Sequence, residues 1–271
     1  MPQRLRLCRS VLFLPASNPR AIEKARGLAA DMVVLDLEDA VKPADKEAAR
    51  AAAVEAAAEG FGDALCAIRL NGTGTPWFGG DAVAMRRCRA DYVILPRVSG
   101  RTELHDAGRL AEHPMLAMIE TAAGVLHAAA IAEESAGLIA GTNDLAADLG
   151  LKPGTHNRPA LRTALQTVVL AARAKGISAF DGVYNKLEAD EGLAQECEEG
   201  RSFGFDGKSL IHPNQIQTAN RLFGPSPEEV NEARRLIAAA TGGAERWEGE
   251  MIERMHVEQA RFTLARARQP A

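Results

Sequence analysis

The sequence has 271 residues, of which 46% are hydrophobic and 25% charged, as is usual for a globular protein. Its net charge of −4, with no block of Lys and Arg, argues against a nucleic-acid-binding protein, and no apolar run is long enough for a membrane span. Four scattered cysteines form no CxxC pair and indicate reduced thiols, so we expect a cytoplasmic protein.

Short apolar runs alternate along the chain with Ala-rich segments of helical periodicity. The first run, 10–16, precedes a helix that Asn18 can cap and that has Pro19 in its first turn. Similar apolar runs follow at residues 32–39, 65–71, 91–98, 115–121, 137–144, 178–184 and 204–211. Helices are predicted between them, including segments 44–59, 80–89, 101–111 and 124–134.

Eight strand–helix units predict a TIM (β/α)8 barrel over residues 1–223. Near-continuous apolar runs are typical of parallel strands covered on both faces. A doubly wound open sheet is the competing interpretation. No GxGxxG motif follows the first strand, which weakens the dinucleotide-binding form of that alternative.

Residues 224–271 follow the last unit and predict a C-terminal helical extension. Ser226 can cap its first helix, with Pro227 at the first helical position. The rest of the extension is expected to continue as a charged helical arm, with an apolar stripe formed by Met251, Ile252 and Met255. The stripe can lie on its own barrel or on a neighbouring subunit of a homo-oligomer, and a solvated helix is the third possibility.

Polar side chains collect at the C-terminal ends of the predicted strands, where barrel enzymes place their chemistry. Glu120 ends the run "MLAMIE" without an evident capping role, and Arg69 interrupts "AIRLN" in the same way. The other polar residues at strand ends are Glu38, Asp39, Asn71, Arg97, Thr121, Asn143, Asp144 and Asp181. Each of Asn143 and Asp144 could simply cap the next helix, but several carboxylates and an arginine on one rim indicate a functional site.

The residue types on this rim suit a metal-assisted reaction. Glu120 and Asp144 are oxygen donors from adjacent strand ends, which suit Mg²⁺ with open positions for a 2-keto acid. Arg69 supplies a planar cation for a carboxylate or a developing enolate oxygen. Glu38 or Asp39 beside Arg69 would orient its guanidinium.

The stretch "GFDGKSLIHP", residues 204–213, has two interpretations. Lys208 could meet an anion, because barrels often bind phosphate near their last two strands. The residue could equally be structural, and His212 before Pro213 is more consistent with a helix start than with catalysis.

The motifs in their order resemble the citrate lyase beta-subunit-like (CitE-like) branch of the HpcH/HpaI aldolase superfamily. The resemblance spans about residues 9–240 and rests on "RSVLFLPASNP", "VVLDLEDAV", "IRLNG", "ILPRV", "IETAAGV", "GTNDLAADLG", "FDGVY" and "GFDGKSLIHPNQI". It implies an oligomeric TIM barrel and Mg²⁺-dependent cleavage or formation of a C–C bond in a 3-hydroxyacyl thioester. By position it implies that Glu120 and Asp144 bind the metal, that Arg69 and Glu120 contact substrate, and that Glu38 holds Arg69.

Two positions depart from the family pattern. Pro96-Arg97-Val98 stands where relatives usually read Pro-Lys-Val. The positive charge is kept, but a planar guanidinium replaces the compact ammonium group of lysine. Glu253 stands where related thioester lyases have an Asp that reaches a neighbouring subunit's site as an acid or base. The resemblance therefore implies a catalytic carboxylate at Glu253, one methylene longer than usual.

The resemblance favours a lyase that acts on a malyl-, citramalyl- or citryl-type thioester of coenzyme A and a 2-keto acid. One alternative is an aldolase that acts on free 2-keto acids. Another is a non-catalytic component of a multisubunit lyase.

Overall fold

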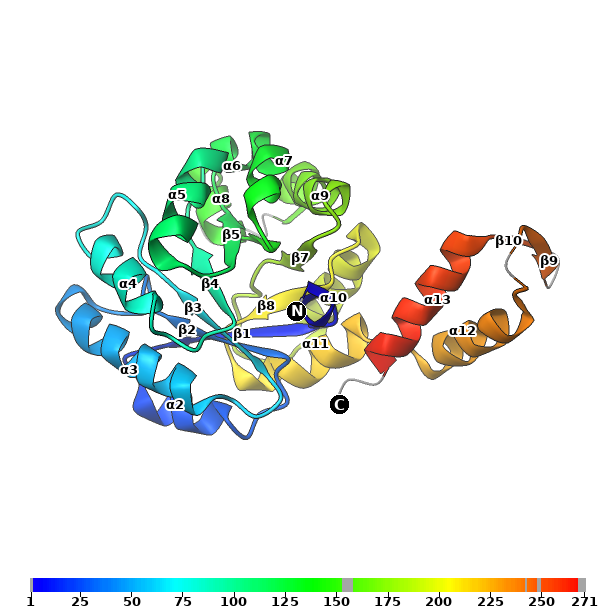
Figure 1. The fold of residues 1–271 in the computed structure, drawn as a ribbon, viewed down its shortest axis with the longest axis horizontal. Coiled ribbons are helices and arrows are strands. Elements are labelled where there is room, and N and C mark those ends of the chain that lie inside the picture. The colour runs from blue at the N-terminus through cyan, green and yellow to red at the C-terminus, as the bar shows by residue number, and fades with distance from the viewer. Residues whose placement is uncertain (1, 153–157, 242, 248–249, 268–271) are drawn as a thin grey trace.

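The computed structural model describes residues 2–152, 158–241, 243–247 and 250–267. Eight parallel strands form a closed barrel in chain order (Figure 1). They are β1 (Ser10–Pro15), β2 (Met32–Asp36), β3 (Leu65–Arg69), β4 (Tyr92–Leu95), β5 (Met115–Ile119), β6 (Gly137–Ala140), β7 (Ser178–Asp181) and β8 (Gly207–Leu210). Because β1 pairs with both β2 and β8, the predicted barrel is confirmed and the open sheet is wrong.

Helices surround the barrel, as the alternation of segments predicts (Figure 1). A short helix that was not predicted, α1 (Pro2–Arg6), precedes β1. The others on the barrel are α2 (Pro19–Ala25), α3 (Lys46–Glu59), α4 (Phe78–Met85), α5 (Arg101–Ala111), α6 (Ala122–Leu126), α7 (Ala128–Ile131), α8 (Thr142–Asp148), α9 (Arg158–Ala174), α10 (Glu191–Phe203) and α11 (Ile216–Phe223). In α2 the predicted Asn18 cap is present, since the Asn18 side chain accepts a hydrogen bond from the Ala21 backbone.

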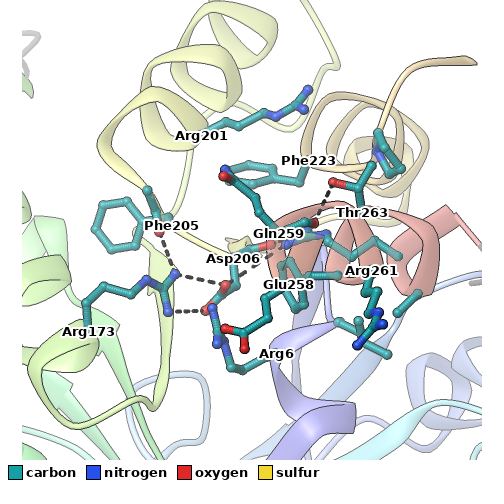
Figure 2. A pocket seen from close by; sticks show the side chains of 16 residues that line it. Arg6, Arg173, Arg201, Phe205, Asp206, Phe223, Glu258, Gln259, Arg261 and Thr263 are labelled. Atoms are coloured by element: carbon teal, nitrogen blue, oxygen red, sulfur yellow. Dashed lines mark hydrogen bonds and ion pairs between the residues drawn. The ribbon is translucent and has the colours of Figure 1, made fainter. Parts of the chain in front are cut away.

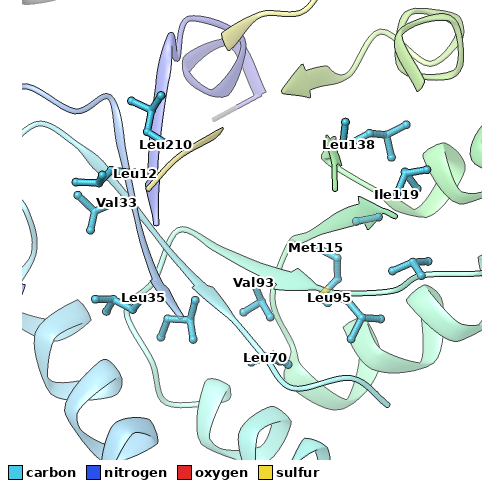
Figure 3. Packing of buried hydrophobic residues seen from close by; sticks show 14 of the residues in the cluster. Leu12, Val33, Leu35, Leu70, Val93, Leu95, Met115, Ile119, Leu138 and Leu210 are labelled. Atoms are coloured by element: carbon cyan, nitrogen blue, oxygen red, sulfur yellow. The ribbon is translucent and has the colours of Figure 1, made fainter. Parts of the chain in front are cut away.

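Alternate residues of each strand face the barrel axis and the helix layer. On β2, Met32 and Val34 belong to the cluster inside the barrel, whereas Val33 and Leu35 pack under the helices. Figure 3 shows Val33 and Leu35 with other residues of this outer cluster. The same alternation on β3 and β5 puts Ala67 and Met118 inside. Polar residues that continue the inner series must therefore point toward the mouth of the barrel.

Asp181 and Lys208 belong to the outer series and lie in the helix layer. Phe180 fills the barrel interior, so its neighbour Asp181 points outward, where it is buried against Lys208 Nζ at 3.0 Å. Arg158 of α9 adds a second cation, with Nη2 2.9 Å from Asp181 Oδ2. The expectation that Asp181 joins the rim is wrong, and of the two interpretations of Lys208 the structural one is confirmed, because both charges are neutralised inside the fold.

The extension begins as predicted and then departs from the prediction. Ser226 forms a capping box with Glu229 at the start of α12 (Pro227–Ala239). The next segment was expected to be helical, but it forms an antiparallel pair, β9 (Glu245–Trp247) and β10 (Glu250–Ile252), before α13 (Arg254–Ala267). Glycines at 243 and 249 in the sequence disfavour a continuous helix, which accounts for the difference.

The extension projects from the barrel as an arm (Figure 1). Helices α12 and α13 lie side by side, and the β9–β10 hairpin lies at the end remote from the barrel. The predicted apolar stripe is only partly correct, because Ile252 is buried whereas the Met251 and Met255 side chains are exposed. Within the ranges that the structure describes, no helix is both long and apolar enough to cross a membrane.

Candidate active site

Arg69 is held by Asp36 at the mouth of the barrel. The two residues are direct partners on β3 and β2, and both continue the inward-facing series. Arg69 Nε and Nη2 each donate to one oxygen of Asp36, at 2.7 Å in both cases. The same carboxylate accepts hydrogen bonds from the backbone N–H groups of Glu38 and Ala40, so its orientation is fixed from two directions.

The sequence analysis assigned the orientation of Arg69 to Glu38 or Asp39, whereas the hydrogen bonds that orient it in the structure are those of Asp36. The signal was present in the strand alternation, because Asp36 follows Met32 and Val34 at intervals of two. What the sequence did not show is the register that sets Asp36 directly beside Arg69.

The surroundings of Arg69 keep it charged. Burial by itself lowers the pKa of this guanidinium, but the hydrogen bonds and charge of Asp36 more than offset that effect, so the pKa is raised. The ring of Phe13 lies below the cation, with its centroid 5.4 Å from Cζ. A fixed, permanently charged planar group therefore faces the barrel mouth.

Glu38 forms a second contact with Arg69. Its Oε2 lies 2.9 Å from Nη1 as an ion pair, although the geometry is not that of a hydrogen bond, and no other described residue donates to this buried oxygen. Burial raises the pKa of Glu38 to about 8, despite the opposing effect of Arg69. Glu38 therefore contacts Arg69, as the sequence analysis expected. The hydrogen bonds that Arg69 donates to a carboxylate, however, go to Asp36.

The raised pKa of Glu38 predicts a pH-dependent stability. Between its ordinary pKa of 4.5 and about 8, the folded protein keeps the Glu38 proton that the unfolded chain releases. The free energy of unfolding should therefore fall as pH rises through this window. Glu38→Gln should remove this contribution. The Tm of the variant minus the Tm of the wild type should therefore increase as pH increases. Parallel Tm curves for the two proteins would contradict the prediction, and exposed Glu55→Gln is the matched control.

Glu120 and Asp144 lie on either side of Arg97. Glu120 follows β5, and its Oε1 accepts a hydrogen bond from the Arg97 backbone N–H at 2.6 Å. Asp144 lies in the first turn of α8, and its Oδ1 accepts from Arg97 Nη1 at 2.8 Å. Burial raises the pKa of Glu120 to about 7; the Arg97 hydrogen bond opposes this rise and the charge of Asp144 adds to it.

Two local features bring these carboxylates together. Arg97 has a positive φ of 54°, a conformation that is costly for a residue other than glycine, and its N–H thereby reaches Glu120. At Gly141 a Cβ would lie 2.3 Å from Glu120 Oε2, so only glycine fits at the end of β6. Asp144 does not cap α8, because the helix starts after Gly141 without a side-chain cap, and Asn143 bonds to Asn185 instead.

The donor set at this point fits Mg²⁺ better than a metal that needs a closed protein cage. Among the residues that the structure describes, no group of three or more His, Cys, Asp or Glu side chains could hold a metal ion. Glu120 and Asp144 supply two carboxylates, and Mg²⁺ commonly binds through one or two carboxylates, with waters and substrate oxygens in the remaining positions. A cation here would also relieve the repulsion between Glu120 and Asp144, which adds to the rise that burial causes in the pKa of Glu120.

These side chains share one cavity of about 400 Å³ at the mouth of the barrel. That volume suits a small ligand or one end of a larger one. The polar lining comprises Asp36, Asp39, Arg69, Thr142, Asn143, Asp144, Glu120 and Ser209, and the apolar lining includes Phe13 and Met118. The structure thus brings together Arg69, Glu120 and Asp144, three of the five candidate residues, while Glu38 contacts Arg69.

Glu253, the fifth candidate, lies elsewhere. It is exposed at the start of α13, where its backbone N–H donates to His256 Nδ1 at 2.9 Å. Because this end of α13 adjoins the hairpin at the tip of the arm, Glu253 does not reach the cavity of its own chain (Figure 1). His212 caps the turn that begins at Pro213, as its structural interpretation predicted.

Comparison with known proteins identifies the family. The family model described as HpcH/HpaI aldolase/citrate lyase matches residues 9–213. The chain belongs to this family. The resemblance seen in the sequence motifs is thereby confirmed, and the matched region includes all eight strands of the barrel.

Relatives within the HpcH/HpaI family differ in the reaction that their names describe. A (3S)-malyl-CoA thioesterase of Cereibacter sphaeroides is 44% identical, over 96% of this chain and 94% of the relative. The citrate lyase subunit beta of Leuconostoc mesenteroides is 35% identical, over 96% and 93%. An L-malyl-CoA/beta-methylmalyl-CoA lyase of C. sphaeroides is 32% identical, over 96% and 94%.

A solved structure shares the fold over nearly the full length. Protein CitE of Mycobacterium tuberculosis, in complex with magnesium, acetoacetate and coenzyme A, aligns with a TM-score of 0.79 and 34% identity. The alignment covers 95% of this chain and 97% of that one. A citrate lyase beta subunit from the same organism, complexed with oxaloacetate and magnesium, aligns with a TM-score of 0.73 and 33% identity, over 82% of this chain and 99% of that one.

Proposed function

We propose that this protein is a Mg²⁺-dependent enzyme that breaks the C–C bond of a malyl-type CoA thioester, giving an acyl-CoA and a 2-oxo acid. The observation that carries the proposal is the placement of the fixed Arg69 cation beside the Glu120–Asp144 pair in one cavity. Relatives named for malyl-CoA, and a related structure that holds magnesium, a keto acid and coenzyme A, support the same chemistry.

Glu120 and Asp144 would hold the Mg²⁺ ion in this proposal. When bound, the metal would polarise the oxygens of the 2-oxo acid portion of the substrate. Glu120 and Asp144 thereby also fix the side of the cavity on which that portion lies.

Arg69 has the role of stabilising negative charge on the thioester portion. Loss of the substrate hydroxyl proton and cleavage of the C–C bond leave an electron pair on the acyl fragment as an enolate, which then takes a proton at carbon. The guanidinium faces the cavity and is already oriented by Asp36, so it can stabilise the enolate oxygen without rearrangement. Asp36 and Glu38 are positioning residues, because each acts through Arg69.

Hydrolysis of the thioester is a second candidate, favoured by the 44% identity to a (3S)-malyl-CoA thioesterase over almost the whole chain. The same Arg69 cation can stabilise the oxyanion that forms when water attacks the thioester carbonyl. Hydrolysis would release free coenzyme A and malate, whereas C–C cleavage would release glyoxylate and acetyl-CoA.

One assay separates these reactions. The protein is incubated with (3S)-malyl-CoA and Mg²⁺, glyoxylate is trapped as its phenylhydrazone, and free thiol is measured in parallel. We expect glyoxylate in step with acetyl-CoA, and free thiol without glyoxylate would assign the hydrolase instead. An aldolase of free keto acids or a non-catalytic subunit, the interpretations that the sequence left open, would yield neither product from the thioester.

We further propose that the protein is a homo-oligomer in which the arm of one subunit lies over the cavity of another. The arm projects away from its own barrel, and Met251 and Met255 are exposed near its tip (Figure 1). Such an arrangement would bring Glu253 to a neighbour's cavity as an acid or base and would exclude water from it.

Subunit complementation tests this shared site. Arg69→Ala and Glu253→Ala proteins should each be inactive, and mixed oligomers should regain part of the activity, because some cavities combine an intact Arg69 with an intact Glu253. Subunit exchange is verified with two mass-labelled preparations. No recovery after complete exchange would exclude the role of Glu253 in a neighbouring site.

A further inference from the structure

A second cavity lies between the barrel and the base of the arm. Its volume is about 760 Å³, and Figure 2 shows the side chains that line it. Phe205 and Asp206 in its wall precede β8, so the cavity adjoins the amino-terminal end of that strand. The candidate active site lies at the opposite, C-terminal end of the strands, and none of the described residues lines both cavities.

Positive charge predominates in the wall of this second cavity. Five arginines and two carboxylates of the described chain line it, and the arginines come from four helices, α1, α9, α10 and α13 (Figure 2). The lining arginines are Arg6, Arg173, Arg201, Arg261 and Arg266, and the carboxylates are Asp206 and Glu258.

Both carboxylates already have cationic partners. Asp206 accepts two hydrogen bonds from Arg173, at 2.8 and 3.1 Å. Glu258 pairs with Arg254, which does not line the cavity, at 2.8 Å. Arg201 is likewise paired, with Glu229 outside the lining, at 2.6 Å. The charges left to face the cavity are therefore those of Arg6, Arg261 and Arg266.

Arg266 is the most buried of these three cations. Only 8% of its surface is exposed; Nη2 donates to the Asp206 backbone oxygen at 2.5 Å, and the Asp206 carboxylate is 4.0 Å from Nη1. Its Nε is buried and has no hydrogen-bond partner among the residues that the structure describes. Burial lowers the pKa of this guanidinium to about 10, the direction expected for a cation that has lost water without gaining a full counter-charge.

Arg6 and Arg266 contact the same aromatic ring. The Cζ atoms of Arg6 and Arg266 lie 4.8 and 5.7 Å from the centroid of the Phe262 ring. Arg6 also has a buried Nε that bonds to nothing in the described part of the chain. Two like charges thus contact one side chain, one from the barrel's first helix and one from the arm, and a nearby anion would offset the free energy that their repulsion costs.

We propose that this cavity binds a phosphate-bearing anion, which joins Arg6 on the barrel to Arg261 and Arg266 on the arm. Guanidinium groups bind phosphate oxygens through paired, charge-assisted hydrogen bonds, and several arginines together match an anion that carries more than one charge. The volume exceeds the need of a single phosphate group and accommodates a pyrophosphate or the phosphate end of a larger molecule. Because the anion bridges α1 and α13, its binding stabilises the attachment of the arm.

Pyrophosphate is the probe that tests this site. Tm and binding heat are measured for the full-length protein with pyrophosphate or ADP, at an ionic strength matched with NaCl. We expect pyrophosphate to raise the Tm of the wild type and to slow hydrogen exchange in residues 254–267. Arg266→Met and Arg6→Met should weaken binding by at least about tenfold, because each removes a charge-assisted contact.

Arg234→Met is the matched control, since Arg234 is exposed on α12 of the same arm and lies outside the cavity lining. It should bind pyrophosphate as the wild type does. If Arg266→Met does not fold, as judged by circular dichroism, Arg6→Met decides the question. A response to ADP as well as pyrophosphate would identify a nucleotide as the source of the phosphate, and a response to pyrophosphate alone an inorganic anion. No binding by the wild type, or equal binding by both cavity variants, would overturn the proposal.

Discussion

Replacing Arg69 by Lys should lower kcat by about 10²- to 10³-fold and leave Mg²⁺ affinity unchanged. Lysine keeps the positive charge but loses the planar group that makes two parallel hydrogen bonds to Asp36. The ammonium would therefore be neither oriented by Asp36 nor able to present a fixed donor to the developing enolate. Steady-state kinetics and calorimetric titration of Mg²⁺ measure the two quantities separately.

Arg86→Lys is the control for this variant, because Arg86 forms an exposed ion pair with Glu112 far from the cavity. It should retain wild-type kcat. Full activity of Arg69→Lys would contradict the proposed role of the planar guanidinium. Equal loss of Mg²⁺ affinity and kcat would place Arg69 in metal binding instead.

Glu120→Gln and Asp144→Asn should each weaken Mg²⁺ binding by more than about 100-fold, since loss of a direct ligand should exceed the effect of losing a ligand's supporting partner. Both substitutions keep the shape of the side chain. The amide that replaces the Glu120 carboxylate would still offer an oxygen to the Arg97 backbone N–H, so the fold should persist. Neutralising a buried carboxyl whose pKa is raised to about 7 should also leave Tm equal to or above that of the wild type at alkaline pH.

Asp39→Asn provides a demanding comparison for the two ligand variants. Asp39 lines the same cavity, so its replacement removes one negative charge from the same surface. We expect only a small change in Mg²⁺ affinity, because Asp39 is not part of the Glu120–Asp144 pair. Similar losses in all three variants would indicate a general effect of charge rather than two specific ligands.

The barrel was predictable because its signal is repeated along the chain. Eight apolar runs of similar length require parallel strands covered on both faces, and all eight became strands of the closed barrel. The arm carries no such repetition. Its two paired strands, Glu245–Trp247 and Glu250–Ile252, have three residues each and are too short to show a strand pattern in the sequence.

The site was predictable in its residue types and less so in its partners. Arg69, Glu120 and Asp144 were found because each interrupts or ends an apolar run, and burial makes such residues conspicuous. The orientation of Arg69 was assigned to Glu38 or Asp39 and not to Asp36, because neither strand alone shows the register between the two. Asp181 was placed on the rim because the alternation of side chains along a strand was not considered. Phe180 points into the barrel, so the next residue, Asp181, points outward.

The contact between Arg97 and Asp144 also lay beyond the sequence. The residue that makes it also has a positive φ, which nothing in "ILPRV" indicates. The family pattern drew attention to this position only because arginine replaces the usual lysine. The structure adds that the side chain donates to one of the two carboxylates proposed to bind the metal.

The central claim is that the cavity lined by Arg69 binds a metal through Glu120 and Asp144, and binds a 2-oxo acid at that metal. Calorimetric titration of glyoxylate into the protein, once with Mg²⁺ and once with EDTA, tests it most directly. We expect saturable binding by the wild type with Mg²⁺ and none with EDTA, and no binding by Glu120→Gln under either condition. Equal affinity for glyoxylate with and without the metal would contradict it.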